Sequence, residues 1–201
     1  MKKLIGTAVF LAMASLSAHA STNVALGSTV AFSGPGLGDD GGWCSGCGTL
    51  TPFPYSSVVD GNFLPFAAQW NINTLYWTAS PTAPSIVTIT LPTVATVTGL
   101  TLQVDNNDGY AISWQDTSNN WHYLDTVTPP DYWGMDTVST TFAPIVAKAF
   151  SVTGVVQSDY HFAISEFQAA GVVPEPETYA LLLAGLGVMG AVARRRKAQQ
   201  A

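Results

Sequence analysis

Short runs in which apolar residues alternate with threonine, separated by clusters of Asn, Asp and Gly, dominate the middle of the chain. Runs 87–91 and 100–104 both have this period of two, which places successive side chains on opposite faces of a β-strand. The cluster Asp105–Gly109 predicts a hairpin turn after the second run, because Asn, Asp and Gly tolerate positive φ. Pro92 predicts the end of the first strand.

The same signals recur about every 8–12 residues, with a second turn predicted at 116–120. Further strands are predicted at 110–114, 121–124, 138–142, 147–153 and 160–169. The sustained 3.6-residue periodicity of a helix is missing from this region. The sequence therefore predicts an all-β fold, a single antiparallel β-sandwich of the jelly-roll type. Trp114 and Trp121 follow the strand alternation, so we expect them in its core.

Charge is unevenly distributed along the chain. Residues 21–171 contain eleven acidic side chains and one basic side chain, Lys148, and the other six basic residues lie at 2–3 and 194–197. The middle region lacks the basic surface that neutralises phosphates, which excludes nucleic-acid binding there. Only 10% of the residues are charged, which also excludes a coiled coil or charged helical bundle.

The first twenty residues have the organisation of a secretory signal peptide. Lys2 and Lys3 precede an apolar run from Leu4 to about Leu16 that is too short to span a bilayer. Ala18 and Ala20 then occupy the −3 and −1 positions of a signal-peptidase site. Residues 1–20 are therefore predicted to be removed by signal peptidase from an exported protein. A short buried helix or an uncleaved anchor is the alternative.

The last thirty residues, 172–201, form a separate tripartite segment. Its parts are the motif Pro174, Glu175 and Pro176, the apolar run 179–193, and the basic residues Arg194, Arg195 and Arg196. Fifteen apolar residues would make a helix about 22 Å long, shorter than the roughly 30 Å hydrocarbon core. We therefore expect a short hydrophobic helix that inserts transiently in the inner membrane, with its basic end cytoplasmic.

This tail resembles the PEP-CTERM sorting signal of Gram-negative bacteria in the order, spacing and polarity of its parts. The resemblance implies recognition by an exosortase and delivery to the cell surface or extracellular matrix. It also implies a link to exopolysaccharide and biofilm. A plain tail anchor is the alternative.

Five segments of the middle region carry a second resemblance. They are Asn23–Gly27, Val59–Asn62, Tyr110–Trp114, Ala147–Val152 and Phe162–Gln168. Together they resemble discoidin-type domains, also called coagulation-factor C-terminal-type or galactose-binding-like modules. The resemblance covers residues 21–171 and implies a non-catalytic carbohydrate-binding sandwich. The tract 34–51 is longer and richer in glycine than in the family, so the resemblance transfers the fold better than the ligand.

The discoidin resemblance also implies a calcium site. Asp60, Asn62 and Glu166 stand at the matching positions, and Ca²⁺ prefers oxygen ligands of this kind. The alternative is an Asx-turn at Asp60 and a solvent-exposed Glu166, without a metal.

Cys44 and Cys47 are the two cysteines of the chain, in a glycine-rich segment. In an oxidising compartment we expect them to form a small loop disulfide. A redox pair would need a following helix, and a zinc site would need two more ligands at suitable spacing. An unpaired state, a redox role and a metal site remain the alternatives.

Several aromatic residues lie among Pro, Gly, Asn and Asp, which places them in or near loops. They are Trp43, Trp70, Trp77, Tyr132 and Trp133. Flat rings beside amide and carboxylate groups can stack on sugars, so Trp43, Tyr132, Trp133 and Trp70 are the candidate ligand-binding residues. Hydrophobic capping of the sandwich is the alternative role.

The sequence thus predicts a carbohydrate-binding protein that is not an enzyme. It contains neither a Gly-x-Ser-x-Gly elbow nor a His-Glu-x-x-His motif. The expected ligand is an exopolysaccharide or cell-surface glycan, either neutral or acidic and bridged by calcium. The alternative from another class is a structural matrix protein that self-associates without a defined sugar site, since weakly charged surfaces associate readily.

Overall fold

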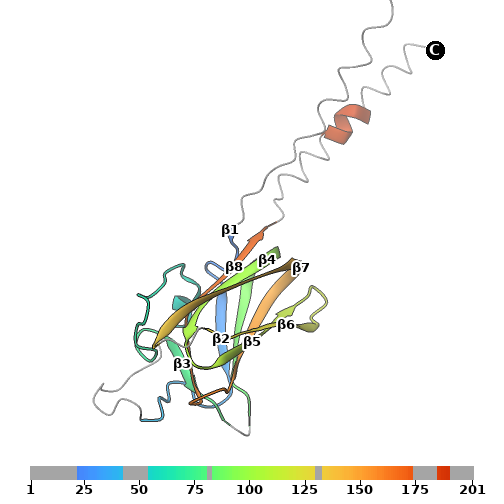
Figure 1. Ribbon diagram of the computed structural model, residues 1–201. Coiled ribbons are helices and arrows are strands. Elements are labelled where there is room, and N and C mark those ends of the chain that lie inside the picture. Colours follow the sequence, from blue (N-terminus) through green and yellow to red (C-terminus); the bar gives the residue numbers. More distant parts are fainter. Residues whose placement is uncertain (1–21, 43–53, 81–82, 130–132, 174–184, 191–201) are drawn as a thin grey trace, which may run out of the picture.

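The computed structural model describes residues 22–42, 54–80, 83–129, 133–173 and 185–190 (Figure 1). Two long strands, β4 (Ile86–Asp105) and β7 (Met135–Val155), organise the domain because each takes part in both of its layers. They pair antiparallel with each other, and the ladder is irregular between Thr90 and Ala95 and again between Val97 and Gly99. These irregularities divide each strand into two halves that pair with different neighbours.

Besides β4 and β7, the strands are β1 (Thr22–Asn23), β2 (Thr29–Ser33), β3 (Leu75–Thr78), β5 (Gly109–Gln115), β6 (Trp121–Val127) and β8 (His161–Val172). In the first layer β8 is central: β3 pairs with it on one side, and the C-terminal half of β4 pairs with it on the other, followed by the N-terminal half of β7. The second layer has the order β2, β4, β7, β5, β6, and it uses the opposite halves of β4 and β7. The predicted single antiparallel β-sandwich is confirmed.

The core lies between the two layers and follows the alternation read from the sequence. Val87 and Ile89 of β4 face it from the second layer, and Leu100 and Leu102 of the same strand face it from the first. The 3₁₀ helix η1 (Tyr55–Val59) adds Val58 and Val59 to this cluster. Burial of these apolar side chains at roughly 25 cal/mol per Å² is the main favourable term in folding the domain.

A second, smaller apolar cluster consists of Trp70, Tyr76, Met135 and Ala163, and Leu64 and Ala68 pack against it. Tyr76 and Ala163 alternate with the core-facing residues of β3 and β8, so this cluster covers the outer side of the first layer. Gln103 of β4 ties the segment over it in place, because its side chain bonds both the backbone N–H and the carbonyl of Leu64.

Both predicted turns are present, but only the second is a hairpin, because β5 pairs with β6 and β7 and the first turn carries the chain from one layer to the other. Asn107 lies in the β4–β5 turn with φ 66° and Asn119 in the β5–β6 turn with φ 71°, the positive values that asparagine tolerates. The prediction that Pro92 ends a strand is wrong, because β4 continues through it to Asp105. Pro92 instead lies within the irregular stretch between Thr90 and Ala95, where no regular ladder bond is lost.

Trp121 was expected in the core, and that expectation is wrong because its side chain is 45% exposed. The cause is an irregularity in the β5–β6 ladder, where Ile112 pairs with Asp125 but Ser113 pairs with Tyr123. The extra residue, Leu124, reverses which side chains of β6 face inward. Trp114, by contrast, packs against the core as predicted.

The tail is described only at residues 185–190, which are helical. Within the described parts of the chain, no helix combines the length and apolar character needed to cross a membrane. The signal peptide with Ala18 and Ala20, the motif at 174–176 and the basic residues at 194–196 lie outside the described residues.

Candidate functional site

The two ends of the sandwich differ in what they carry. At one end β1 begins and β8 finishes, since Thr22 pairs with Gly171, and we call this the tail end. At the opposite end β3 and β4 finish and β7 and β8 begin, and we call this the loop end (Figure 1). The segments that join these strands therefore converge at the loop end, the arrangement by which a rigid scaffold positions binding groups.

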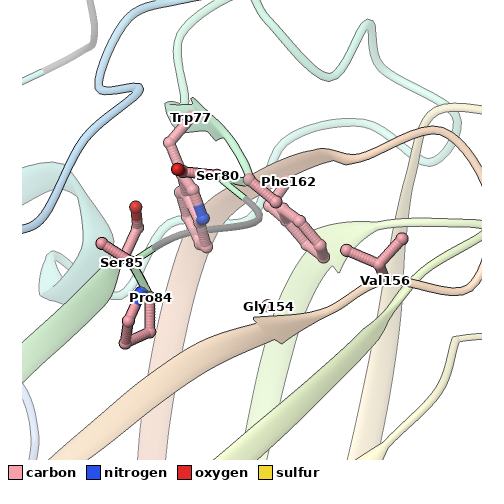
Figure 2. Close-up of a pocket in the computed structure, with 9 residues that line it drawn as sticks. Trp77, Ser80, Pro84, Ser85, Gly154, Val156 and Phe162 are labelled. Atoms are coloured by element: carbon pink, nitrogen blue, oxygen red, sulfur yellow. The ribbon is translucent and has the colours of Figure 1, made fainter.

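A cavity of about 270 Å³ opens at the loop end (Figure 2). Trp77 of β3 and Phe162 of β8 line it and stack on each other, with 5.6 Å between ring centroids and 19° between ring planes. Ser85 lines another part and is fixed by the bond that its hydroxyl donates to the Pro35 carbonyl at 2.6 Å. Trp77, predicted to lie in or near a loop, belongs to β3 one residue before that strand ends, and its side chain is buried.

The Phe162 ring packs directly over the backbone of Gly154 in β7, and both residues line the cavity. A Cβ atom at this glycine would collide with the ring carbons of Phe162. Val156 continues the wall beyond Gly154 (Figure 2). The cavity is thus small and is lined by both apolar and hydroxyl-bearing side chains. This combination suits a small ligand that has polar groups and an apolar face.

His161 and Trp70 form a second aromatic group at the loop end. Their rings lie 5.2 Å apart at 44°, and His161 Nδ1 is 3.5 Å from Asp159 Oδ1. Trp70 was predicted to bind the ligand, but it is only 6% exposed and belongs to the second apolar cluster. In this position it supports the histidine instead of presenting a free ring face to solvent.

Trp133 is the predicted ligand-binding aromatic that the structure places on the surface, with 65% of its area exposed. Gly134 follows it with φ 79°, and a side chain there would collide with the Ala68 carbonyl. The backbone N–H of Met135 donates to the same carbonyl at 2.9 Å. Trp133 is therefore held beside the segment that contains Ala68. The other predicted binding residues, Trp43 and Tyr132, lie outside the described residues, as do Cys44 and Cys47.

Two buried carboxyl groups lie in the β4–β5 turn at this end. Asp108 Oδ1 accepts the backbone N–H groups of Gln157 and Ser158, whereas its Oδ2 has no hydrogen-bond partner among the described residues. Asp105 is 1% exposed, and its Oδ1 is also without a partner. Burial, with a smaller contribution from the negative charge of Asp159, raises the pKa of Asp105 to about 8. Burial raises the pKa of Asp108 as well.

The predicted calcium residues lie away from the loop end, where η1 meets β8. The backbone N–H of Gly61 donates to both carboxylate oxygens of Glu166, at 3.1 and 3.2 Å. Asp60 accepts the backbone N–H of Asn62 at 2.8 Å, so the Asx-turn is present. Glu166, however, is fully buried instead of solvated. The structure thus brings Asp60 and Glu166 together.

The surroundings of Glu166 change the pKa of its carboxyl group. Burial, with a smaller contribution from the negative charge of Asp60, raises its pKa to about 7 against the lowering effect of hydrogen bonds from Gln168 and Gly61. Lys148, the one lysine or arginine among the described residues, bonds to Asn119 near the β5–β6 turn. Among those residues no group of three or more His, Cys, Asp and Glu side chains is arranged to hold a metal. A hard cation at Glu166 and Asp60 would therefore need carbonyl oxygens as its other ligands.

Comparison with solved structures relates this sandwich to carbohydrate-binding modules. A family 32 carbohydrate-binding module from Clostridium perfringens NanJ, solved with galactose, aligns with a TM-score of 0.50 over 75% of this chain and 98% of that one, at 16% identity. Chitosan-binding module 1 of a Paenibacillus sp. IK-5 chitosanase/glucanase gives 0.49 over 74% and 98%, at 23% identity. The comparison with curated proteins finds no match.

The described domain therefore has the galactose-binding-like β-sandwich fold found in family 32 carbohydrate-binding modules. Residues 172–197 match the PEP-CTERM protein-sorting motif. The chain thus combines a module of this fold with a sorting signal that implies export and processing by an exosortase.

Proposed function

We propose that this protein is a non-catalytic carbohydrate-binding protein, delivered by exosortase to the cell surface or extracellular matrix, where it binds exopolysaccharide. The observation that carries the proposal is the exposed ring of Trp133 at the loop end, the end at which the small cavity also opens. Sugar rings have apolar CH faces that stack on aromatic side chains and hydroxyl groups that bond to polar neighbours. The tail end, where residue 172 leads into the sorting motif, lies at the opposite end of the sandwich. A protein held by its tail would present the loop end outward.

The test is binding of the purified full chain to a glycan array and to immobilised polysaccharides. We expect the Trp133→Ala variant to lose about fivefold in affinity, since a stacked ring contributes on the order of 1 kcal/mol, and the combination with Trp43→Ala to lose at least about tenfold. Val146→Ala, at an exposed position near the tail end, is the control and should bind like the parent. Binding that survives the double substitution would refute the loop-end site, and a blank array would refute the function.

We also propose that Ca²⁺ binds where Gly61 meets Glu166, with Asp60 and Glu166 as its carboxylate ligands. The ion would neutralise a buried carboxylate that has no cationic partner among the described residues, and it would tie the segment after η1 to β8. Its role would be structural, because this position is separate from the loop end.

Adding saturating Ca²⁺ to chelator-treated protein should raise the melting temperature by about 5–10 °C, as expected for a ligand at about 100 times its Kd. The gain should be larger at pH 8 than at pH 6, because a proton competes for Glu166 near its pKa of about 7. Glu166→Gln should abolish the gain, whereas Asp39→Asn, distant in the glycine-rich loop, should keep it. An unchanged melting temperature in saturating Ca²⁺ would rule out the site.

A further inference from the structure

The outer surface of the second layer is a face without charged side chains. The strand registers place fifteen side chains on it, in three rows that each cross β2, β4, β7, β5 and β6. The middle row runs Ala31, Thr88, Ser151, Ser113, Tyr123. The row nearer the tail end starts at Thr29 and finishes at Trp121. None of the fifteen positions is Asp, Glu, Lys or Arg. We call this surface the outer face.

Two exposed aromatic rings stand side by side at the β6 edge of the outer face. Trp121 is 45% exposed and Tyr123 is 66% exposed. They are two residues apart on one strand, which places them about 7 Å apart on the same side. They face outward because of the irregularity at Leu124, without which both would point into the sandwich. The fold therefore exposes two large rings that a regular strand would bury.

The hairpin that carries these rings is well ordered by its own contacts. On the inner side, His122 stacks on Trp114 with 4.6 Å between ring centroids, and its Nε2 bonds Asp116 Oδ2 at 2.9 Å. Asp116 also accepts the backbone N–H groups of Ser118 and Asn120. On the outer side, the Tyr123 hydroxyl bonds the Thr126 hydroxyl at 3.0 Å. A ligand would thus meet an ordered hairpin and a Tyr123 ring held by its hydroxyl, which lowers the entropy cost of binding.

The lack of charge on the outer face, together with its hydroxyl groups and two aromatic rings, favours a neutral ligand. Residues 21–171 carry eleven acidic side chains, yet the outer face carries none. It offers hydroxyl groups at Thr88, Ser113 and Ser151 and the amide of Gln115, beside the two rings. A charged polymer would find no counter-charge here, whereas a neutral polyhydroxylated chain finds both hydrogen-bonding groups and stacking surfaces. Five strands spaced about 4.8 Å apart make the face about 19 Å wide, enough for several sugar rings.

We propose that the outer face binds a neutral polysaccharide chain, which stacks on Trp121 and Tyr123 and extends across the strands over the row of small hydroxyl-bearing residues. This inference rests on the proposed carbohydrate-binding function and adds a second site, distinct from the cavity at the loop end. The loop end would bind a chain terminus or a single sugar, and the outer face would bind an extended segment.

The experiment is affinity electrophoresis of the full chain in native gels that contain galactomannan, hydroxyethyl cellulose or, as the acidic comparison, alginate. We expect the neutral polymers to retard the parent, and Trp121→Ala combined with Tyr123→Ala to weaken that binding by about tenfold or more. Tyr123→Phe should keep most of it, since the ring remains. Val146→Ala is the control, and circular dichroism checks that each variant is folded.

Four other outcomes are possible, and each would contradict the proposed site on the outer face. If the double variant binds the neutral polymers like the parent while Trp133→Ala loses them, the outer face is not a binding site but the loop-end function stands. If neither neutral polymer retards the parent, both proposals fail. Equal retardation by alginate would contradict a site for neutral chains. If the parent is a dimer that the double variant dissociates with no effect of polysaccharide, the outer face is an interface between copies instead.

Discussion

Replacing Asp105 by asparagine is expected to raise the free energy of unfolding at pH 8 by several kcal/mol and to leave it nearly unchanged at pH 4. Asp105 is almost completely buried, and one of its carboxyl oxygens has no hydrogen-bond partner. Desolvation, reinforced by the negative charge of Asp159, raises its pKa from 3.8 to about 8. Asparagine keeps the shape of the side chain but cannot ionise, so it avoids the cost of a buried charge.

The direction of this effect follows from proton linkage. A carboxyl group whose pKa is raised by folding binds more protons in the folded than in the unfolded state between pH 3.8 and about 8. Its contribution to stability is therefore complete below that window and is lost as the pH rises through it. Each unit of pKa difference corresponds to about 1.4 kcal/mol. The pKa values of Asp108 and Glu166 are also raised, so these two groups also make the folded domain less stable as the pH rises. The stability of the Asp105→Asn variant should therefore still fall with rising pH, but less steeply than that of the parent.

Urea denaturation of parent and variant at pH 4, 6 and 8 measures the effect. Asp116→Asn is the control of opposite sign, because hydrogen bonds from His122 and from the backbone of Asn120 lower the pKa of Asp116 to about 2. That substitution should lower the stability at pH 8. If Asp105→Asn instead destabilises the domain at pH 8, the carboxylate is ionised and stabilised in the folded protein, and the assignment of a raised pKa is wrong.

The strands could be predicted because their signal is local. The alternation in 87–91 and 100–104 fixes which side chains share a face, and the Asn and Asp clusters fix where the chain turns. That both runs belong to one strand, β4, could not be read from the sequence, because Pro92 usually ends a strand and is tolerated here only by the irregular ladder.

Trp121 shows the limit of pattern reasoning within one strand. Trp121 and Tyr123 share one face of β6, as a period of two requires. A single extra residue in β6 turns that face outward instead of toward the core. Bulges of this kind depend on the partner strand, so they leave no signal in the residues of β6 alone. The outer face was missed for the same reason.

The candidate sites were predicted unevenly. The meeting of Asp60 and Glu166 followed only from the resemblance to discoidin-type domains, since more than a hundred residues separate them. Asp105 and Asp108 looked like ordinary turn residues, and their burial depends on the distant segment 157–159 that folds against them. Trp70 and Trp77 looked like loop aromatics because Asn and Pro surround them, yet the sandwich buries both.

Substituting Trp77 by alanine should lower the free energy of unfolding by about 3–5 kcal/mol, the usual cost of removing a buried tryptophan. Besides its stacking on Phe162, Trp77 contacts Tyr110 edge to face, with 6.5 Å between ring centroids and 84° between planes. It also packs against Phe32, at 5.9 Å. The side chain therefore joins β3 to both layers, and alanine would leave a void that these rings cannot fill without losing their mutual contacts.

A domain of this size is stable by roughly 5–15 kcal/mol, so this single change should remove a large part of its stability. Trp133→Ala is the matched control, because the same side chain is 65% exposed there and its loss should change the stability by no more than about 0.5 kcal/mol. Trp77→Phe should fall between the two, since a smaller ring can still stack on Phe162. Denaturant midpoints of the three variants give the comparison. Equal losses for Trp77→Ala and Trp133→Ala would mean that Trp77 is not buried between the layers, and the aromatic floor of the loop-end cavity would then be misplaced.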